Sequence, residues 1–278
     1  MGLTVQVGAE FEFYLFKTDA NGDPTKEPFD RAGYMDVAPE DRGENVRREI
    51  CLTLLDMGIL PECSHHEEGP GQNEIDFRYS DALRAADDAM NFQTVVKATA
   101  QRNGLYADFS PKPLPGESGN GLHINLSLTS ADGADRLPAF MAGILAHVAE
   151  CTAFLNPTED SYLRLGEKKA PCYVTWSPEN RSPLIRIPAA DRAHRRLEVR
   201  SPDPLANPYL AYALLIHAGL DGIETGMTPP PPVNGNLFRA DAATTEKLVR
   251  LPASLSKARA LAKDSAFIRK YLPGFLAF

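Results

Sequence analysis

The stretch Ala9-Glu10-Phe11-Glu12-Phe13 (residues 9–13) alternates acidic and apolar side chains. Successive side chains of a β-strand point to opposite faces, so Glu10 and Glu12 would share one face, about 7 Å apart. The apolar residues would share the other face and pack into a core. We therefore predict a strand over residues 5–16 with an acidic face that something must neutralise.

Three further stretches repeat this alternation: Glu74-Ile75-Asp76-Phe77-Arg78, His123-Ile124-Asn125-Leu126 and Arg196-Leu197-Glu198-Val199-Arg200. A solvated sheet face would explain any one of them alone. Together they present carboxylates, an imidazole and arginines, and crowded carboxylates repel one another unless cations neutralise them. This donor set suits hard divalent ions such as Mg²⁺ or Mn²⁺ rather than structural zinc. The four strands therefore favour a shared metal site.

Hydrophobic periodicity places the remaining elements. We predict helices over residues 43–57, 81–103, 137–155 and 209–224. We predict strands over residues 62–67, 73–79, 122–128, 184–187 and 195–200, with a turn at Gly69-Pro70-Gly71 and a loop over residues 21–30. The proline run at residues 229–232 should be extended and should separate a helical tail from the main body.

Composition narrows the class of protein. The 278 residues are 43% hydrophobic and 24% charged, which is ordinary for a soluble globular protein. The net charge of −8 argues against a general nucleic-acid binder. No run approaches the roughly 18 consecutive apolar residues typical of a membrane helix. The four cysteines show no C-x-x-C pair and the chain opens on a strand-like stretch rather than a signal peptide, so we expect a reduced, cytoplasmic setting.

Arginines are concentrated between residues 181 and 200. They are Arg181, Arg186, Arg195, Arg196 and Arg200. The guanidinium fork grips phosphate or carboxylate, and beside a carboxylate-held metal it fits phosphoryl transfer. Surface salt bridges are the ordinary alternative for any single arginine. Because the sequence has no phosphate-binding glycine loop of the Walker or dinucleotide type, a nucleotide would be held by metal and arginine.

These segments, in this order, resemble the glutamine synthetase family of the class I bacterial and archaeal type. The matching strings are Gly8-Ala9-Glu10-Phe11-Glu12-Phe13, His65-His66-Glu67, Gly71-Gln72-Asn73-Glu74, Gly119-Asn120-Gly121-Leu122-His123, Asn180-Arg181-Ser182, Ile185-Arg186-Ile187-Pro188 and Arg196-Leu197-Glu198-Val199-Arg200. The resemblance implies an α+β fold with a curved, largely antiparallel sheet flanked by helices, related to the guanidino kinases. It also implies one catalytic domain over residues 1–278.

The resemblance assigns roles residue by residue. Glu12, Glu67 and Glu74 would hold one divalent ion, and Glu10, His123 and Glu198 a second. Arg164, Arg200 and the Gly119 backbone would bind substrate glutamate, while Arg181 and Arg186 would meet the transferred phosphoryl group. The implied ATP contacts are Glu62, Tyr79, Ser127 and Arg196, and Tyr34 matches a tyrosine near the ammonium site.

The implied reaction is ligation of ammonia to the γ-carboxylate of glutamate through γ-glutamyl phosphate. It uses ATP and two or more Mg²⁺ or Mn²⁺ ions. The implied partners are these small molecules and, for a full-length protein, further copies of itself in a dodecamer, with no nucleic acid and no membrane.

Some features depart from the family pattern. We expect the family's N-terminal β-grasp domain to be absent here and the C-terminal helical part to stop early. Lys169 stands directly before Ala170-Pro171, where the family carries a glutamate, which reverses the charge beside a site meant to attract a cation. A γ-glutamyl ligase for a larger amine, and an inactive fragment that binds metal and nucleotide, therefore remain open alternatives.

Overall fold

The computed structural model describes residues 2–178, 180–191 and 194–275. Within these ranges the strands form a nine-stranded sheet in the order β3-β4-β1-β6-β9-β8-β7, with β2 and β5 also paired to β1. The strands are β1 (Leu3–Thr18), β2 (Pro24–Pro28), β3 (Pro61–His66), β4 (Gln72–Asp81), β5 (Leu105–Asp108), β6 (Leu122–Ser130), β7 (Trp176–Ser177), β8 (Ile185–Arg186) and β9 (Leu197–Val199). Only the β7–β8 pair is parallel among these pairings, which confirms the largely antiparallel sheet.

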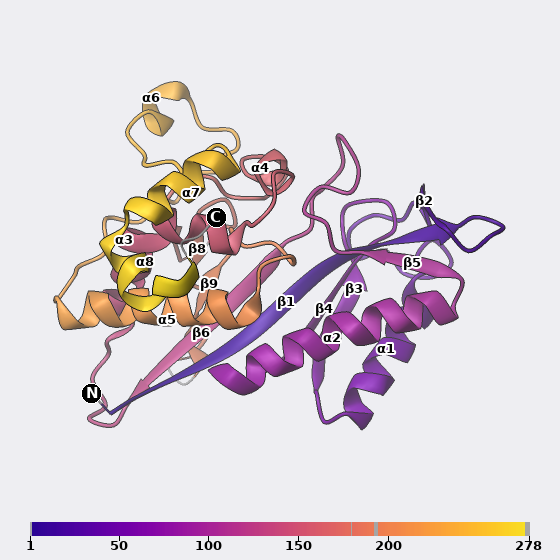
Figure 1. Cartoon of the computed structure of the whole chain (residues 1–278), viewed down its shortest axis with the longest axis horizontal. Coiled ribbons are helices and arrows are strands. Elements are labelled where there is room, and N and C mark those ends of the chain that lie inside the picture. Colours follow the sequence, from indigo (N-terminus) through magenta and orange to yellow (C-terminus); the bar gives the residue numbers. More distant parts are fainter. Residues whose placement is uncertain (1, 179, 192–193, 276–278) are drawn as a thin grey trace.

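Strand β1 organises the sheet and crosses the molecule diagonally in Figure 1. It lies antiparallel between β4 and β6, in a register that sets Glu10 opposite both Asp76 and His123. The same register sets Glu12 opposite Glu74. The acidic alternation of β1 is thus carried across neighbouring strands, and the polar side chains share one face of the sheet.

The opposite face of the sheet is buried beneath helices. The helices that cover it are α1 (Glu44–Asp56), α2 (Ala82–Arg102), α3 (Leu137–Leu155) and α5 (Pro208–Glu224). Figure 1 shows α1 and α2 beside one end of β1 and α3 and α5 beside the other. Phe11 of β1 packs against Phe77, Phe92 and Phe109, with ring centroids 5.1–6.5 Å apart. This aromatic cluster fixes the backbone that carries Glu10 and Glu12.

Helices α3 and α5 cross closely because glycines face each other. A Cβ atom on Gly143 would lie 2.1 Å from the carbonyl oxygen of Ala218, and one on Gly222 would lie 2.2 Å from that of Ala139. By length and mean hydropathy α3 could cross a membrane, which the count of consecutive apolar residues did not indicate. However, 67% of its most apolar window is buried inside the fold, as in a core helix.

The predicted helices 43–57, 81–103, 137–155 and 209–224 are confirmed within a residue or two. The expected loop over residues 21–30 is wrong in part, because residues 24–28 form β2 on the edge of β1. The sequence reading also missed β5, β7 and the short helix α4 (Ser161–Arg164). The tail after the prolines is helical as expected, with α6 (Ala242–Thr245), α7 (Leu255–Asp264), α8 (Ala266–Tyr271) and the 3₁₀ turn η2 (Pro273–Phe275), and α7 packs on α3.

Candidate metal and substrate site

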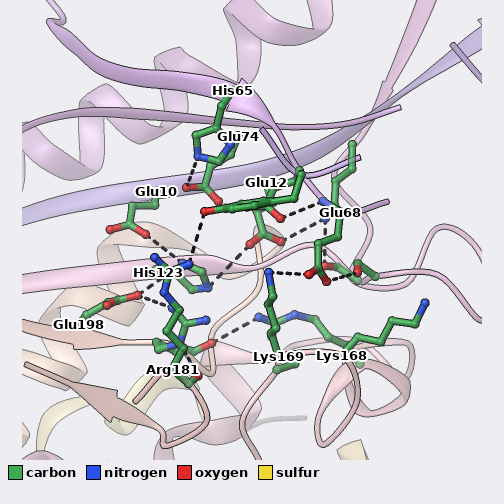
Figure 2. Close-up of a pocket in the computed structure, with 18 of the residues that line it drawn as sticks. Glu10, Glu12, His65, Glu68, Glu74, His123, Lys168, Lys169, Arg181 and Glu198 are labelled. Atoms are coloured by element: carbon green, nitrogen blue, oxygen red, sulfur yellow. Dashed lines mark hydrogen bonds and ion pairs between the residues drawn. The ribbon is translucent and has the colours of Figure 1, made fainter. Parts of the chain in front are cut away.

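One predicted metal triad is assembled on the polar face of the sheet. The Nδ1 atom of His123 lies 3.0 Å from Glu10 Oε2 and 3.8 Å from Glu198 Oε1. One ligand atom from each of these three residues lies within 4.8 Å of the other two. Figure 2 shows the three side chains converging from β1, β6 and β9. The strands therefore bring one ligand atom of each residue close enough to share a metal ion.

The three residues of the second predicted triad do not form one close group. Glu12, Glu67 and Glu74 line the same cavity, but the close groups are Glu12 with Glu74 and His123, and Glu67 with Glu74 and His65. Glu74 is therefore common to both groups. His65 was not among the predicted ligands, although it pairs with Glu74 across the β3–β4 hairpin, with Nε2 3.4 Å from Glu74 Oε1.

A further carboxylate, Asp76, was also missed. It lies two residues beyond Glu74 on the same face of β4 and forms a close group with Glu74 and Glu10. The signal was present in the sequence, because the alternation that selects Glu74 also selects Asp76. Its Oδ1 atom is buried and has no hydrogen-bond partner within the described residues.

The surroundings of most carboxyl groups on this face disfavour their ionised form. Burial, together with the neighbouring Glu74 and Glu10, raises the pKa of Asp76 to about 11. Burial and nearby carboxylates also raise the pKa of Glu12 and Glu67. Glu10 differs: burial opposes its ionisation, but hydrogen bonds with His123 and Asn125 outweigh it and lower its pKa to about 2.

This donor set fits divalent metal. The unpartnered Asp76 oxygen and the raised pKa values of Glu12 and Glu67 mark a cluster with more negative charge than the protein itself compensates. Oxygen donors with one or two imidazoles match Mg²⁺ or Mn²⁺.

The cavity that holds these residues has a volume of about 210 Å³ and is also lined by the predicted substrate residues. Arg164 is buried and donates to the backbone oxygens of Ser201 and Arg200 at 2.9 and 3.3 Å. Gly119 lies against it, and a Cβ atom there would come within 2.4 Å of the carbonyl oxygen of Pro111. Only glycine leaves room for the backbone at this point.

The predicted phosphoryl-contacting arginines line the same cavity. Arg186 Nη1 donates to Glu198 Oε2 at 2.8 Å, and Arg200 pairs with the other oxygen of Glu198. Arg181 Nη1 lies 3.4 Å from the hydroxyl of Tyr34. Glu198 thus ties two guanidinium groups to the Glu10–His123 triad, and positive charge borders the carboxylates.

A second cavity, of about 460 Å³, lies on the other side of the triad. It is lined by all four predicted nucleotide contacts: Glu62, Tyr79, Ser127 and Arg196. Glu10 and Asp76 line both cavities, so they stand where the two meet. A hydrogen-bonded chain from Arg196 Nε to Asn125 Oδ1 (3.0 Å) and from Asn125 Nδ2 to Glu10 Oε1 (2.7 Å) connects the cavities.

Comparison with known proteins gives the family. A family model described as "Glutamine synthetase, catalytic domain" matches residues 1–276. Curated relatives named glutamine synthetase include one from Methanosarcina mazei, 45% identical over 98% of this chain and 64% of its own length. Another, from Clostridium saccharobutylicum, is 44% identical over 98% of this chain and 65% of its own length.

Solved structures agree with these relatives. A structure described as a GmaS/ADP complex has a TM-score of 0.85 at 33% identity and covers 97% of this chain and 66% of its own. A Plasmodium falciparum glutamine synthetase has a TM-score of 0.80 at 25% identity, covering 96% of this chain and 68% of its own. The chain thus spans somewhat less than two thirds of the length of the curated relatives it matches.

Proposed function

Because this chain belongs to the glutamine synthetase family, matched by the family's catalytic domain, we propose that it is the catalytic domain of an ATP-dependent ligase. The proposed reaction joins ammonia, or another amine, to the γ-carboxylate of glutamate through γ-glutamyl phosphate. The observation that carries this proposal is the meeting of two cavities at Glu10 and Asp76, beside a cluster of candidate metal ligands.

The lining residues support binding of a different substrate in each cavity. ATP would occupy the larger one, with Arg196, Glu62, Tyr79 and Ser127 around it, and its γ-phosphoryl group would point past Glu10. Glutamate would occupy the smaller cavity, with its α-carboxylate near Arg164 or Arg200. This order would bring the γ-carboxylate of glutamate toward the γ-phosphorus of ATP.

Arginines would then stabilise the charge that develops on phosphoryl transfer. Arg181 and Arg186 border the carboxylate cluster and offer the guanidinium donors that a transferred phosphoryl group requires. Divalent ions held by the Glu10–His123–Glu198 group and the groups around Glu74 would supply Lewis-acid and charge-neutralising chemistry. The amine would attack the carbonyl carbon of the acyl phosphate from the side of the cavity lined by Tyr34 and Lys169. Its nitrogen would form the amide bond and lose a proton to solvent as the bond to phosphate breaks and inorganic phosphate leaves.

The test is formation of γ-glutamyl hydroxamate from glutamate, ATP and hydroxylamine with Mg²⁺ or Mn²⁺. The chain is assayed together with whatever further segments its gene encodes, in the homo-oligomer that we propose by analogy with the family. Product that disappears in an Arg186→Ala variant supports the proposal. Binding of ATP and metal with no product from any amine would refute it and would favour the inactive, ligand-binding alternative.

A second candidate, ligation of an amine larger than ammonia, is favoured by Lys169. Lys169 stands where the family carries a glutamate, so the carboxylate that would attract free ammonium is missing from this part of the cavity wall. Comparing turnover with ammonia and with a panel of amines separates the two candidates, since turnover with ammonia alone would exclude the second.

A further inference from the structure

The ammonium group of Lys169 contacts two other residues that line the smaller cavity, through a partly exposed ion pair and a cation–π contact. Lys169 Nζ lies 2.7 Å from Glu68 Oε1 and 4.5 Å from the centre of the Tyr34 ring. Lys169, Glu68 and Tyr34 all line the cavity, and Figure 2 shows the Lys169 side chain reaching toward Glu68. The lysine therefore occupies space that opens onto the candidate reaction site.

A carboxylate combined with an aromatic face is a binding site for an organic cation. The carboxylate accepts charge-assisted hydrogen bonds from N–H groups, and the π face attracts the positive charge. The end of a lysine side chain is chemically a primary alkylammonium ion. What Glu68 and Tyr34 bind in this structure is thus an alkylammonium group that belongs to the protein itself.

The loop that carries Lys169 has an unusual backbone conformation and is held by neighbouring ion pairs. The φ angles of Lys168 and Lys169 are 35° and 69°, in the left-handed region that non-glycine residues adopt at a cost. Ion pairs hold the two residues that precede Lys169: Glu167 pairs with Lys112 at 3.1 Å, and Lys168 with Glu117 at 3.6 Å. The side chains of Glu167 and Lys168 are exposed, and ion pairs made by exposed side chains are individually weak, so the loop can release Lys169 at small cost.

The geometry points to a primary alkylammonium subsite formed by Glu68 and Tyr34, which Lys169 fills as an internal ligand until a substrate amine displaces it. This inference rests on the proposed ligation of an amine and names the class of that co-substrate: a primary alkylamine whose ammonium group takes the place of Lys169 Nζ. An internal ligand lowers the apparent affinity for the external one, because binding requires the subsite to be vacated first.

Binding of n-propylammonium, measured by ligand-observed NMR, tests the inference without reference to catalysis. Lys169→Ala empties the subsite and should tighten binding at least tenfold over the wild type. Lys168→Ala is the matched control, since it removes the same charge from the same loop but from a lysine that pairs with Glu117 instead. It should change the affinity less than twofold. Adding Glu68→Gln to Lys169→Ala should abolish the gain.

Equal affinities in the wild type and Lys169→Ala, or equal gains in the two alanine variants, would overturn the inference. The outcome is separable from that of the proposed function. If the binding pattern holds but no γ-glutamyl product forms with any amine, the ligase proposal fails and the subsite stands. If product forms and the Lys169→Ala affinity is unchanged, the ligase proposal stands and the subsite fails.

Discussion

Replacing Glu74 by glutamine should stabilise the protein without metal and weaken the response to metal. Glu74 belongs to three of the close groups of candidate ligands, whose ligand atoms lie within 4.8 Å of one another. Glutamine keeps the shape of the side chain and removes its charge. Because most core substitutions destabilise, a gain in stability at a buried position would be a distinctive result.

The magnitude follows from the spacing of the charges. Two unit charges 4.8 Å apart repel by about 3.5 kcal/mol at an effective dielectric constant of about 20. Protonation of Asp76, whose pKa burial, Glu74 and Glu10 raise to about 11, already relieves part of this repulsion. The lost contact with His65 at 3.4 Å offsets about a further 1 kcal/mol. A net gain of about 1 kcal/mol remains, equivalent to roughly 2–4 °C in Tm.

Thermal unfolding with and without MnCl₂ measures both effects. A ligand at a free concentration of 100 times its Kd stabilises a protein by about 2.7 kcal/mol. A tenfold loss of affinity removes about 1.4 kcal/mol of this stabilisation. We expect Glu74→Gln to raise the metal-free Tm and to lose at least half of the Mn²⁺-induced rise. Glu246→Gln, at an exposed position, should change neither. A lower metal-free Tm with an undiminished Mn²⁺ response would show that Glu74 neither repels its neighbours nor binds the metal.

Three further outcomes follow from the structure. Gly143→Ala should destabilise the chain by about 2–3 kcal/mol in denaturant unfolding, because its Cβ would lie 2.1 Å from the Ala218 oxygen; a change below 0.5 kcal/mol would contradict the close helix crossing. Arg196→Ala should weaken ADP binding in calorimetry at least tenfold and leave the KM for glutamate within about twofold. The reverse pattern would contradict the placement of ATP in the larger cavity. Burial and Lys270 lower the pKa of His217, so the neutral ring favours the fold above pH 6.5 and that contribution is lost as pH falls through the folded pKa. His217→Phe should therefore reduce the fall in Tm between pH 7.5 and 5, by a small amount because the ring is partly exposed, and an unchanged slope would contradict the assignment.

The central strands could be predicted because the side-chain period of a strand is unambiguous where charged and apolar residues alternate. Glu10, Glu12 and Glu198 each sit between buried apolar neighbours, so their face was fixed by the core. Strand β2 gave no such signal, since its sequence has prolines at both ends and only one alternation to read. It forms because β1 extends beyond its main partners and offers it a free edge.

The grouping of the ligands could not be read from the sequence. The turn between β3 and β4 pairs Glu67 with Gln72, and the register that follows from it sets His65 rather than Glu67 opposite Glu74. The contact between Lys169 and Glu68 joins residues far apart in the chain through a bent loop, for which no local pattern exists. Periodicity thus finds the face of each strand, while register and loop geometry decide which residues on that face meet.

Anomalous diffraction from crystals soaked in MnCl₂ would locate the metal ions themselves. We expect two manganese peaks on the polar face of the sheet, one coordinated by Glu10, His123 and Glu198 and the other by carboxylates that include Glu74. Peaks located elsewhere, or no manganese bound among these residues at millimolar concentration, would contradict this expectation.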